Sequence, residues 1–328
     1  MTTLRWGVLA TGSIARMFTR DARLAGLEVA AVGSRSEAAA RAFAEEHGIA
    51  RAYGSYEALA ADPQVDIVYV ATPHPHHCAA ARMLLEHGKH ALVEKPFTLN
   101  RREAESLRDL ARSRGLLVME AMWTRYLPHM IRIRELIAAE ALGEIRAVAA
   151  DHTQSLPADP AHRLNALELG GGALLDLGIY PISLAWDLLG EPTSVKASGR
   201  LGETGADTEV ATVCTHAGGA LSTSLSSSRA AGPNSAHIIG SKGRIDIHRV
   251  WYTAADFTVY GVDGGVVEQY ASEIPGRGMQ YQALAAERYV AEGRLEGDLL
   301  TLDDSVGIMG TLDEIRRQLG VVYPGERA

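Results

Sequence analysis

The sequence lacks cysteine-rich stretches, an excess of positive charge and long apolar runs. Cys78 and Cys214 are the only cysteines in 328 residues, too few for a disulfide framework or a zinc site, so a reducing compartment is expected. Lys and Arg total 32 against 40 Asp and Glu, and the resulting net charge of −8 argues against nucleic-acid binding. No apolar run approaches the ~20 residues that cross a bilayer, and no signal-peptide pattern opens the chain. We therefore expect a cytoplasmic protein that binds neither nucleic acid nor membrane.

What is present is an ordinary globular composition. Hydrophobic residues make up 47% and charged residues 22%, which excludes disorder and collagen-like sequence. At ~150 residues per domain, the length indicates about two domains.

The first third alternates short apolar runs with Ala-rich helical stretches. Because strands that are apolar throughout and separated by helices indicate a parallel sheet covered on both faces, this pattern predicts a doubly wound, Rossmann-type domain. Asn100, followed three residues later by Glu103, predicts a capped helix start. The expected strands are 4–9, 27–32, 65–71, 90–93 and 116–119. The first expected helix ends near residue 24, and the others span 37–47, 56–61, 75–86 and 100–114.

The pattern changes after about Met122. Helices are expected at 130–139, 172–189, 279–291 and 303–319, and β-rich runs joined by Gly- and Asn-containing turns fill 195–270. Such runs are typical of a mostly antiparallel sheet. The fold class is therefore α/β, with an N-terminal Rossmann domain (1–122) and a C-terminal α+β domain with an open, mostly antiparallel sheet (123–328). An arrangement in which helix 303–319 packs back on the first domain stays open.

A glycine turn follows the first expected strand. The residues Ala10, Thr11, Gly12, Ser13, Ile14 and Ala15 form a G-x-G-x-x-G/A pattern with Ala in the first position. Such a turn lets the backbone approach a pyrophosphate, and the helix that follows offers free N–H groups. The second strand ends at Ser34 and Arg35 with no carboxylate before Glu37. A hydroxyl and a guanidinium suit a 2′-phosphate, so NADP is favoured over NAD.

Further polar residues follow the ends of two strands and lie on one later helix. Thr72, Pro73 and His74 follow one strand, and Glu94, Lys95 and a proline follow the next. Ligands bind at these carboxyl ends in open parallel sheets. Asp176 and Tyr180 are four residues apart and share a mostly apolar helix face, where they require a polar partner such as Lys95. A helix-internal hydrogen bond without a catalytic role is the alternative.

Together these motifs resemble the glucose–fructose oxidoreductase / inositol dehydrogenase / MocA (Gfo/Idh/MocA) family over nearly the whole chain. The marks are Glu94-Lys95-Pro96, the glycine turn, Ala71-Thr72-Pro73 and the helix from Gly172 to Tyr180. Residues 120–125, 177–181, 303–305 and 312–320 are similar to the branch of dimeric dihydrodiol dehydrogenase and D-xylose 1-dehydrogenase. Ala10 departs from the commonest glycine turn of the family.

The resemblance implies an assignment of site residues. Lys95 and Tyr180 would lie at the reacting hydroxyl with Asp176 orienting them, and either Lys95 or Tyr180 could be the base. Thr72, Pro73 and His74 would border the nicotinamide ribose, with His77 and Glu94 also on the cofactor side. Trp123 and Arg125 would face the substrate, and so would His162 and Arg163 from the loop before the Gly172 helix. His74, His76 and His77 are adjacent, but no metal site is predicted from them.

The expected activity is that of an NADP-dependent oxidoreductase. It would move a hydride between nicotinamide and the CH–OH or C=O group of a sugar, polyol or cyclic trans-diol, as an aldose 1-dehydrogenase or dihydrodiol dehydrogenase does. The alternatives are a keto-sugar or anhydro-sugar reductase and a nucleotide-sensing regulator without turnover. Family members commonly pair through the C-terminal sheet, so a homodimer is expected through the face carrying Val210, Val213, Leu221 and Leu225.

Overall fold

The computed structural model describes residues 4–326, which form two compact units. The first unit contains the chain up to Trp123 and the segment Ile274–Val306, and the second contains Thr124–Glu273 and the chain from Gly307 onward. The sequence suggests one boundary after residue 122, whereas the structure returns Ile274–Val306 to the first unit.

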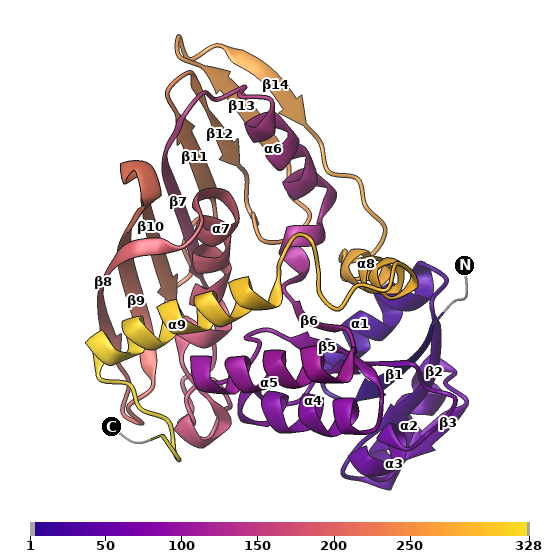
Figure 1. Cartoon of the computed structure of the whole chain (residues 1–328). Coiled ribbons are helices and arrows are strands. Elements are labelled where there is room, and N and C mark those ends of the chain that lie inside the picture. The colour runs from indigo at the N-terminus through magenta and orange to yellow at the C-terminus, as the bar shows by residue number, and fades with distance from the viewer. Residues whose placement is uncertain (1–3, 327–328) are drawn as a thin grey trace. The chain divides into compact units, whose positions relative to one another are not determined.

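The first unit is built on a six-stranded parallel sheet in the order β3-β2-β1-β4-β5-β6 (Figure 1). This is the strand order of a Rossmann domain, so the expected fold class is confirmed. Side chains of β1 and β4 are buried because helices cover both faces. The strands are β1 Arg5–Leu9, β2 Glu28–Gly33, β3 Arg51–Tyr53, β4 Ile67–Val70, β5 His90–Glu94 and β6 Val118–Ala121.

Helices α2 and α5 of the first unit start and stop where their capping residues predict. Ser36 and Asn100 accept backbone N–H bonds at the starts of α2 and α5, and Gly48 and Gly115 end these helices in the left-handed conformation. Asp21 of α1 accepts the N–H groups of Arg277 and Met279, which ties the returning segment to this unit. The helices are α1 Ser13–Leu24, α2 Glu37–His47, α3 Tyr56–Ala60, α4 His77–Glu86, α5 Arg101–Arg114 and α8 Gln280–Ala291.

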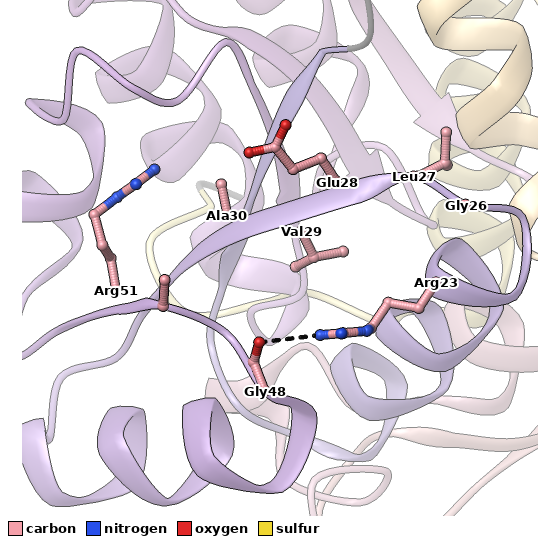
Figure 2. Close-up of a pocket in the computed structure, with 9 residues that line it drawn as sticks. Arg23, Gly26, Leu27, Glu28, Val29, Ala30, Gly48 and Arg51 are labelled. Atoms are coloured by element: carbon pink, nitrogen blue, oxygen red, sulfur yellow. Dashed lines mark hydrogen bonds between the residues drawn. The ribbon is translucent and has the colours of Figure 1, made fainter.

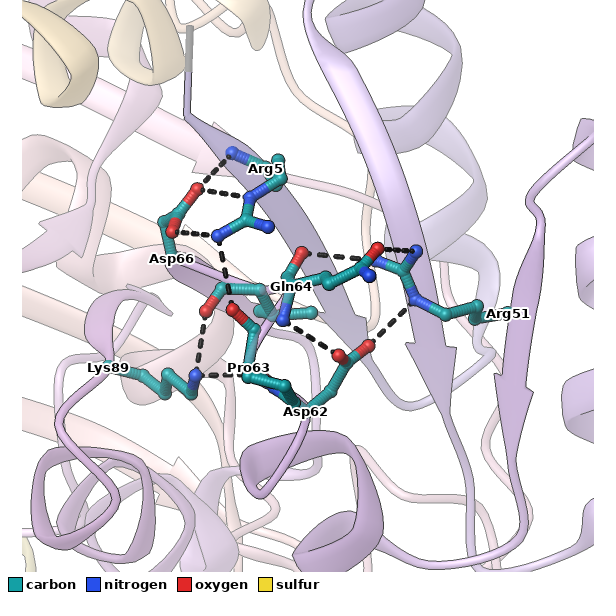
Figure 3. A network of polar contacts seen from close by, with 8 residues as sticks. Arg5, Arg51, Asp62, Pro63, Gln64, Asp66 and Lys89 are labelled. Atoms are coloured by element: carbon teal, nitrogen blue, oxygen red, sulfur yellow. Dashed lines mark hydrogen bonds and ion pairs between the residues drawn. The ribbon is translucent and has the colours of Figure 1, made fainter. Parts of the chain in front are cut away.

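A polar network closes the edge of this sheet where the strands begin (Figure 3). Asp62 accepts hydrogen bonds from the Gln64 N–H at 2.8 Å, the Tyr53 hydroxyl at 2.9 Å and the Arg51 Nε at 2.8 Å. Burial alone would raise the pKa of Asp62, but these hydrogen bonds lower it overall. Lys89 Nζ donates to the carbonyl oxygens of Asp62 and Val65. The network therefore fixes the loop that leads into β4.

The second unit is built on an eight-stranded sheet in the order β14-β13-β12-β11-β7-β10-β9-β8. Within this second sheet, β7 and β10 pair in parallel and the other neighbouring strands pair antiparallel, so the expectation of a mostly antiparallel sheet is confirmed. The strands are β7 Ile145–Thr153, β8 Pro192–Leu201, β9 Asp207–His216, β10 Leu221–Ser227, β11 Ala236–Gly240, β12 Gly243–Ile247, β13 Phe257–Gly261 and β14 Val266–Tyr270.

One face of this sheet is covered by the segment Leu174–Leu189, a π-helical turn (Leu174–Gly178) followed by α7 (Ile179–Leu189). A Cβ on Gly178 would lie 3.0 Å from Ser226 Oγ, so small residues on both sides allow the close approach. Residues Leu167–Leu189 are long and apolar enough to span a membrane, but 83% of that window is buried inside the structure, as in a core helix. Helix α6 spans Pro128–Ala138, and α9 (Leu302–Leu319) begins in the first unit and continues into the second.

The opposite face of the second sheet is exposed and carries aliphatic side chains. Val213, Leu221, Leu225 and Ile239 are between 43% and 49% exposed. Val210, which the sequence analysis placed with them, is 1% exposed and lies on the covered face. The assignment of Val210 was wrong because side chains three residues apart in a strand point to opposite faces.

Candidate active site

The glycine turn joins β1 to α1 in the first unit. Gly12 immediately precedes α1 and no side chain of the turn caps the helix, so the first N–H groups of α1 remain available to an anion. A Cβ added to Gly12 would meet no heavy atom within 4 Å. Packing within the chain therefore does not require glycine here, whereas close approach of a pyrophosphate would. Ala10 has φ +83°, in the region that favours glycine.

The end of β2 carries Ser34 and Arg35. Ser34 is 8% exposed and its hydroxyl accepts the Ser36 N–H at 3.3 Å, while Ser36 rather than Ser34 caps α2. Arg35 is exposed and lies beside Tyr56, whose pKa is raised by burial although Arg35 lowers it. An exposed guanidinium next to a buried hydroxyl can bind a phosphate on the ribose of a dinucleotide.

Thr72 and His77 lie behind the ends of β4 and β5. The ring nitrogens of His77 lie 2.8 Å from the carbonyl oxygens of Thr72 and Pro96, so one buried imidazole joins the two strand ends. Burial lowers the pKa of His77 to about 4, and the neutral ring donates one of these bonds. Thr72 Oγ1 is buried and has no hydrogen-bond partner within residues 4–326. A hydroxyl in that state fits a cofactor that approaches from outside the chain.

The turn that carries Lys95 is held from behind by carboxylates. Glu94 Oε2 accepts the Lys95 N–H at 3.1 Å, and its other oxygen accepts the Tyr69 hydroxyl. Glu120, 2% exposed on β6, accepts the Phe97 N–H at 3.0 Å and the Ser305 hydroxyl at 2.8 Å. Two motifs singled out in the sequence, residues 120–125 and 303–305, thus meet under the Lys95 turn.

Trp123 ends the first unit and is buried, with 2% of its surface exposed. The Arg277 guanidinium lies 5.0 Å from the centroid of its ring, a cation–π contact. Trp123, which was expected to face the substrate, therefore contacts a cationic side chain that sequence analysis did not single out.

Asp176 and Tyr180 belong to the second unit. Asp176 lies in the π-helical turn and Tyr180 in the first turn of α7, and they are 8% and 7% exposed. Arg163 Nη1 lies 3.3 Å from Asp176 Oδ1, so the expected substrate residue Arg163 contacts an expected catalytic one. π-Helical turns inside helices are frequent at functional sites.

An aromatic cluster that sequence analysis missed surrounds Tyr180. The ring of His152 stacks on Tyr252 with centroids 3.7 Å apart, and Tyr180 meets His152 edge-on at 5.0 Å. Gln154 Nε2 lies 2.8 Å from His152 Nε2 and donates to the Tyr252 hydroxyl at 3.4 Å. Residues 152 and 252 are a hundred positions apart, and only the alternation of β7, which turns His152 to the covered face, could have indicated one of them.

Two expected substrate residues have other contacts. Arg125 is 5% exposed, and its guanidinium donates to Ser183 Oγ at 3.0 Å and lies 3.6 Å from Asp187. These contacts tie Arg125 to α7, and its contact with a substrate stays a prediction. His162 accepts the Leu164 N–H at 3.4 Å within its own loop.

Two other features were considered as candidate sites, a metal-binding cluster and a surface hollow of the first unit. Within the described chain no group of three or more His, Cys, Asp or Glu side chains could hold a metal ion. A hollow of about 310 Å³ is lined by Arg23, Glu28, Val29 and Arg51, among others (Figure 2). It lies at the start of β2, whereas the glycine turn adjoins the end of β2.

Comparison with known proteins decides the family. Residues 4–122 match "Oxidoreductase family, NAD-binding Rossmann fold", and residues 130–246 match "GFO/IDH/MocA C-terminal domain". The chain belongs to the Gfo/Idh/MocA family. It is therefore an NAD(P)-dependent oxidoreductase that acts on CH–OH groups.

Similar proteins extend over the full length. A trans-1,2-dihydrobenzene-1,2-diol dehydrogenase of Danio rerio is 36% identical, with 98% of both chains covered. A D-xylose 1-dehydrogenase (NADP(+)) of Hypocrea jecorina is 36% identical over 98% of this chain and 93% of the relative. The structure of a 3-ketoreductase from Actinomadura kijaniata in complex with TDP-benzene and NADP is 29% identical, has a TM-score of 0.80 and covers 96% and 97% of the two chains.

Proposed function

We propose that this Gfo/Idh/MocA protein is an NADP-dependent dehydrogenase whose substrate is a sugar or polyol, or else a cyclic trans-diol. The observation that carries the substrate class is the cluster around Tyr180. His152, Gln154 and Tyr252 place polar edges beside the phenol, and such edges suit several hydroxyl groups on one substrate. Their stacked rings also provide a flat surface, which supports a cyclic substrate. A keto-sugar reductase is the alternative, because the same residues serve either direction of the reaction.

The chain's own residues would bind the cofactor and move the proton. The bound nicotinamide supplies hydride transfer. The start of α1 would hold the pyrophosphate, and Ser34 and Arg35 the 2′-phosphate. Thr72 and His74 would border the ribose. Tyr180 would exchange a proton with the substrate hydroxyl, and the Lys95 ammonium would stabilise negative charge on that oxygen. Asp176 would orient Tyr180 with the help of Arg163.

Cofactor preference is tested by fluorescence titration with NADPH and NADH. Arg35→Ala should weaken NADPH binding by about tenfold to a hundredfold, because one charge-assisted contact is lost, and leave NADH binding unchanged. Equal losses for both cofactors would show that Arg35 does not recognise a 2′-phosphate. Binding of NADH alone in the wild type would overturn the NADP assignment.

Catalytic roles are tested with D-xylose and trans-1,2-dihydrobenzene-1,2-diol as probes. Tyr180→Phe and Lys95→Met should each lower kcat by about 10²–10⁴-fold while NADPH still binds. If both side chains act on one hydroxyl, the double variant should lose little more than the worse single variant. Multiplicative losses would show that the two residues act independently, and unchanged turnover would remove the residue concerned from the mechanism.

The exposed sheet face supports a homodimer, and the two free cysteines support a cytoplasmic location. Val213, Leu221, Leu225 and Ile239 form an apolar patch that a second copy would cover. Leu225→Lys should convert a dimer to a monomer in size-exclusion chromatography with light scattering. A wild-type chain that elutes as a monomer would refute this assembly.

A further inference from the structure

The helix segment that carries Asp176 and Tyr180 starts without a cap from its own sequence. Ala173 occupies the cap position before the π-helical turn Leu174–Gly178, and it has no side-chain oxygen to accept a hydrogen bond. The first N–H groups of a helix have no partner within the helix, and burying them unpaired is costly. This segment is buried, so the acceptor must come from elsewhere in the fold.

Asp207, the first residue of β9, supplies that acceptor. Its side chain is 1% exposed, and its Oδ2 accepts the Leu174 N–H at 2.6 Å. Its Oδ1 has no hydrogen-bond partner within residues 4–326. A carboxylate at a helix start also interacts favourably with the positive end of the helix dipole.

The glycine triplet before this helix makes room for the carboxylate. Gly172 has φ +145°, and a Cβ there would lie 2.3 Å from Asp207 Oδ1. The Tyr323 hydroxyl donates to the Gly171 carbonyl at 2.9 Å and lies 3.3 Å from the same Cβ position. Glycine at position 172 therefore leaves the space that the buried Asp207 carboxylate occupies at the helix start.

We propose that Asp207 is a positioning residue that fixes the first turn of this helix and thereby the placement of Asp176 and Tyr180. The proposal rests on the proposed function of Tyr180. Its physical reason is that a reacting group displaced by about 1 Å can lose about 10²-fold in rate. Because Asp207 accepts the Leu174 N–H, it would act through the backbone at the start of the helix.

The charge of Asp207 gives this role a pH signature. Burial raises the pKa of Asp207 to about 6, although the hydrogen bond from the Leu174 N–H and the charge of Arg316 lower it. The groups that face it from the C-terminal segment are Tyr323 and Arg316, and Arg316 is paired with Asp313 and Glu326. The Asp207 carboxyl therefore changes charge near pH 6. The acceptor at the helix start is a charged carboxylate above this pH and a neutral carboxylic acid below it, so kcat of the wild type should change near pH 6.

The test compares Asp207→Ala and Asp207→Asn with a matched control, Asp62→Asn. Asp62 is also a buried carboxylate that accepts a backbone N–H, but it belongs to the first unit, where it precedes β4. For each variant we would measure hydrogen–deuterium exchange of residues 170–182, the NADPH dissociation constant, and kcat and KM for D-xylose with NADP between pH 5 and 9.

Asp207→Ala should speed exchange at the helix start and lower kcat at least about tenfold, with NADPH affinity unchanged. Asp207→Asn keeps an oxygen that can accept the Leu174 N–H, so it should retain most of the protection of the helix start against hydrogen–deuterium exchange. Because the amide does not titrate, this variant should lose the change in kcat near pH 6 that the wild type is expected to show. Asp62→Asn should alter neither readout. Unchanged exchange in Asp207→Ala would overturn the proposal, and so would faster exchange with unchanged kcat. A wild-type chain with no turnover of D-xylose or the dihydrodiol would instead count against the proposed function, and the exchange data would still decide whether Asp207 orders the helix.

Discussion

Replacement of Ala10 by glycine tests the glycine turn most directly. Ala10 follows β1 with φ +83°, and its N–H donates to the Gly33 carbonyl at 2.8 Å, so the backbone is held in the left-handed region. This conformation costs an L-residue about 1–2 kcal/mol because Cβ approaches the backbone oxygen. Ala10→Gly should remove that cost from the folded state.

The gain is reduced by the greater freedom of glycine in the unfolded chain, about 0.5–1 kcal/mol. The net expectation is therefore a stabilisation of about 0.5–1 kcal/mol. Because the hydrogen bond to Gly33 uses the backbone, the substitution preserves it. Removal of Cβ adds no atom to the turn, so NADPH affinity should not fall.

The assay is urea unfolding followed by tryptophan fluorescence, with NADPH titration on the same preparations. Ala61→Gly is the matched control, because Ala61 ends α3 with φ −76° and gains nothing from glycine. It should lose about 0.5–1 kcal/mol. If Ala10→Gly were destabilised by the same amount as Ala61→Gly, the conformation of Ala10 would not be strained and the reasoning would be wrong.

Three further predictions concern buried carboxylates. Glu120→Ala should lower kcat about tenfold by freeing the Phe97 N–H beneath the Lys95 turn, and Glu120→Gln, which keeps an acceptor, should lose less; steady-state kinetics decide. Asp62→Ala should lower the free energy of unfolding by about 2 kcal/mol, because Tyr53 and the Gln64 N–H lose their acceptor. Urea unfolding measures this, and a loss no larger than that of a surface variant such as Asp263→Ala would contradict the prediction. The pKa of Asp207, raised to about 6 from its ordinary 3.8, means that the folded state holds this proton more tightly than the unfolded chain. Wild-type stability relative to Asp207→Asn should therefore fall as pH rises from about 4 to about 6, by up to about 3 kcal/mol, and a parallel pH dependence of the two proteins would exclude it.

Most of the Rossmann domain could be predicted from the sequence because its signals are local. Each buried parallel strand reads as an apolar run, and α2 spans the expected residues 37–47 between a serine cap and a left-handed glycine. The three-residue strand β3 was missed because it is too short to show a pattern.

The second unit was harder to predict because its organisation depends on pairings between distant segments. The alternation of β9 and β10 indicated strands, but nothing local indicates that β7 lies at the centre and pairs in parallel with β10. The return of Ile274–Val306 to the first unit is likewise set by tertiary contacts such as those of Asp21. Val210 is different, because strict alternation along β9 already separates it from Val213.

Candidate site residues were predictable where they stand in short motifs and unpredictable where they support such motifs from behind. Lys95 and Tyr180 were singled out as candidates through the turn and the helix that contain them. Glu120 and Asp207 are remote in sequence from the backbone groups they bind, and no spacing rule connects them. Arg125 was expected to face the substrate, and its contact with Ser183 had no local signal, because an arginine beside a motif looks the same in sequence whatever its side chain contacts.

The two supporting carboxylates suggest how each unit would hold the side chain that we propose to react. In the first unit Glu120 accepts an N–H of the turn that carries Lys95, and in the second Asp207 accepts an N–H of the helix start that carries Tyr180. Both are at most 2% exposed, so their hydrogen bonds do not compete with water. A side chain on a turn held in this way needs little reorganisation when charge develops during the reaction. It follows that variants of these carboxylates should impair kcat before they impair cofactor binding, and that order of effects separates support of catalysis from support of the fold.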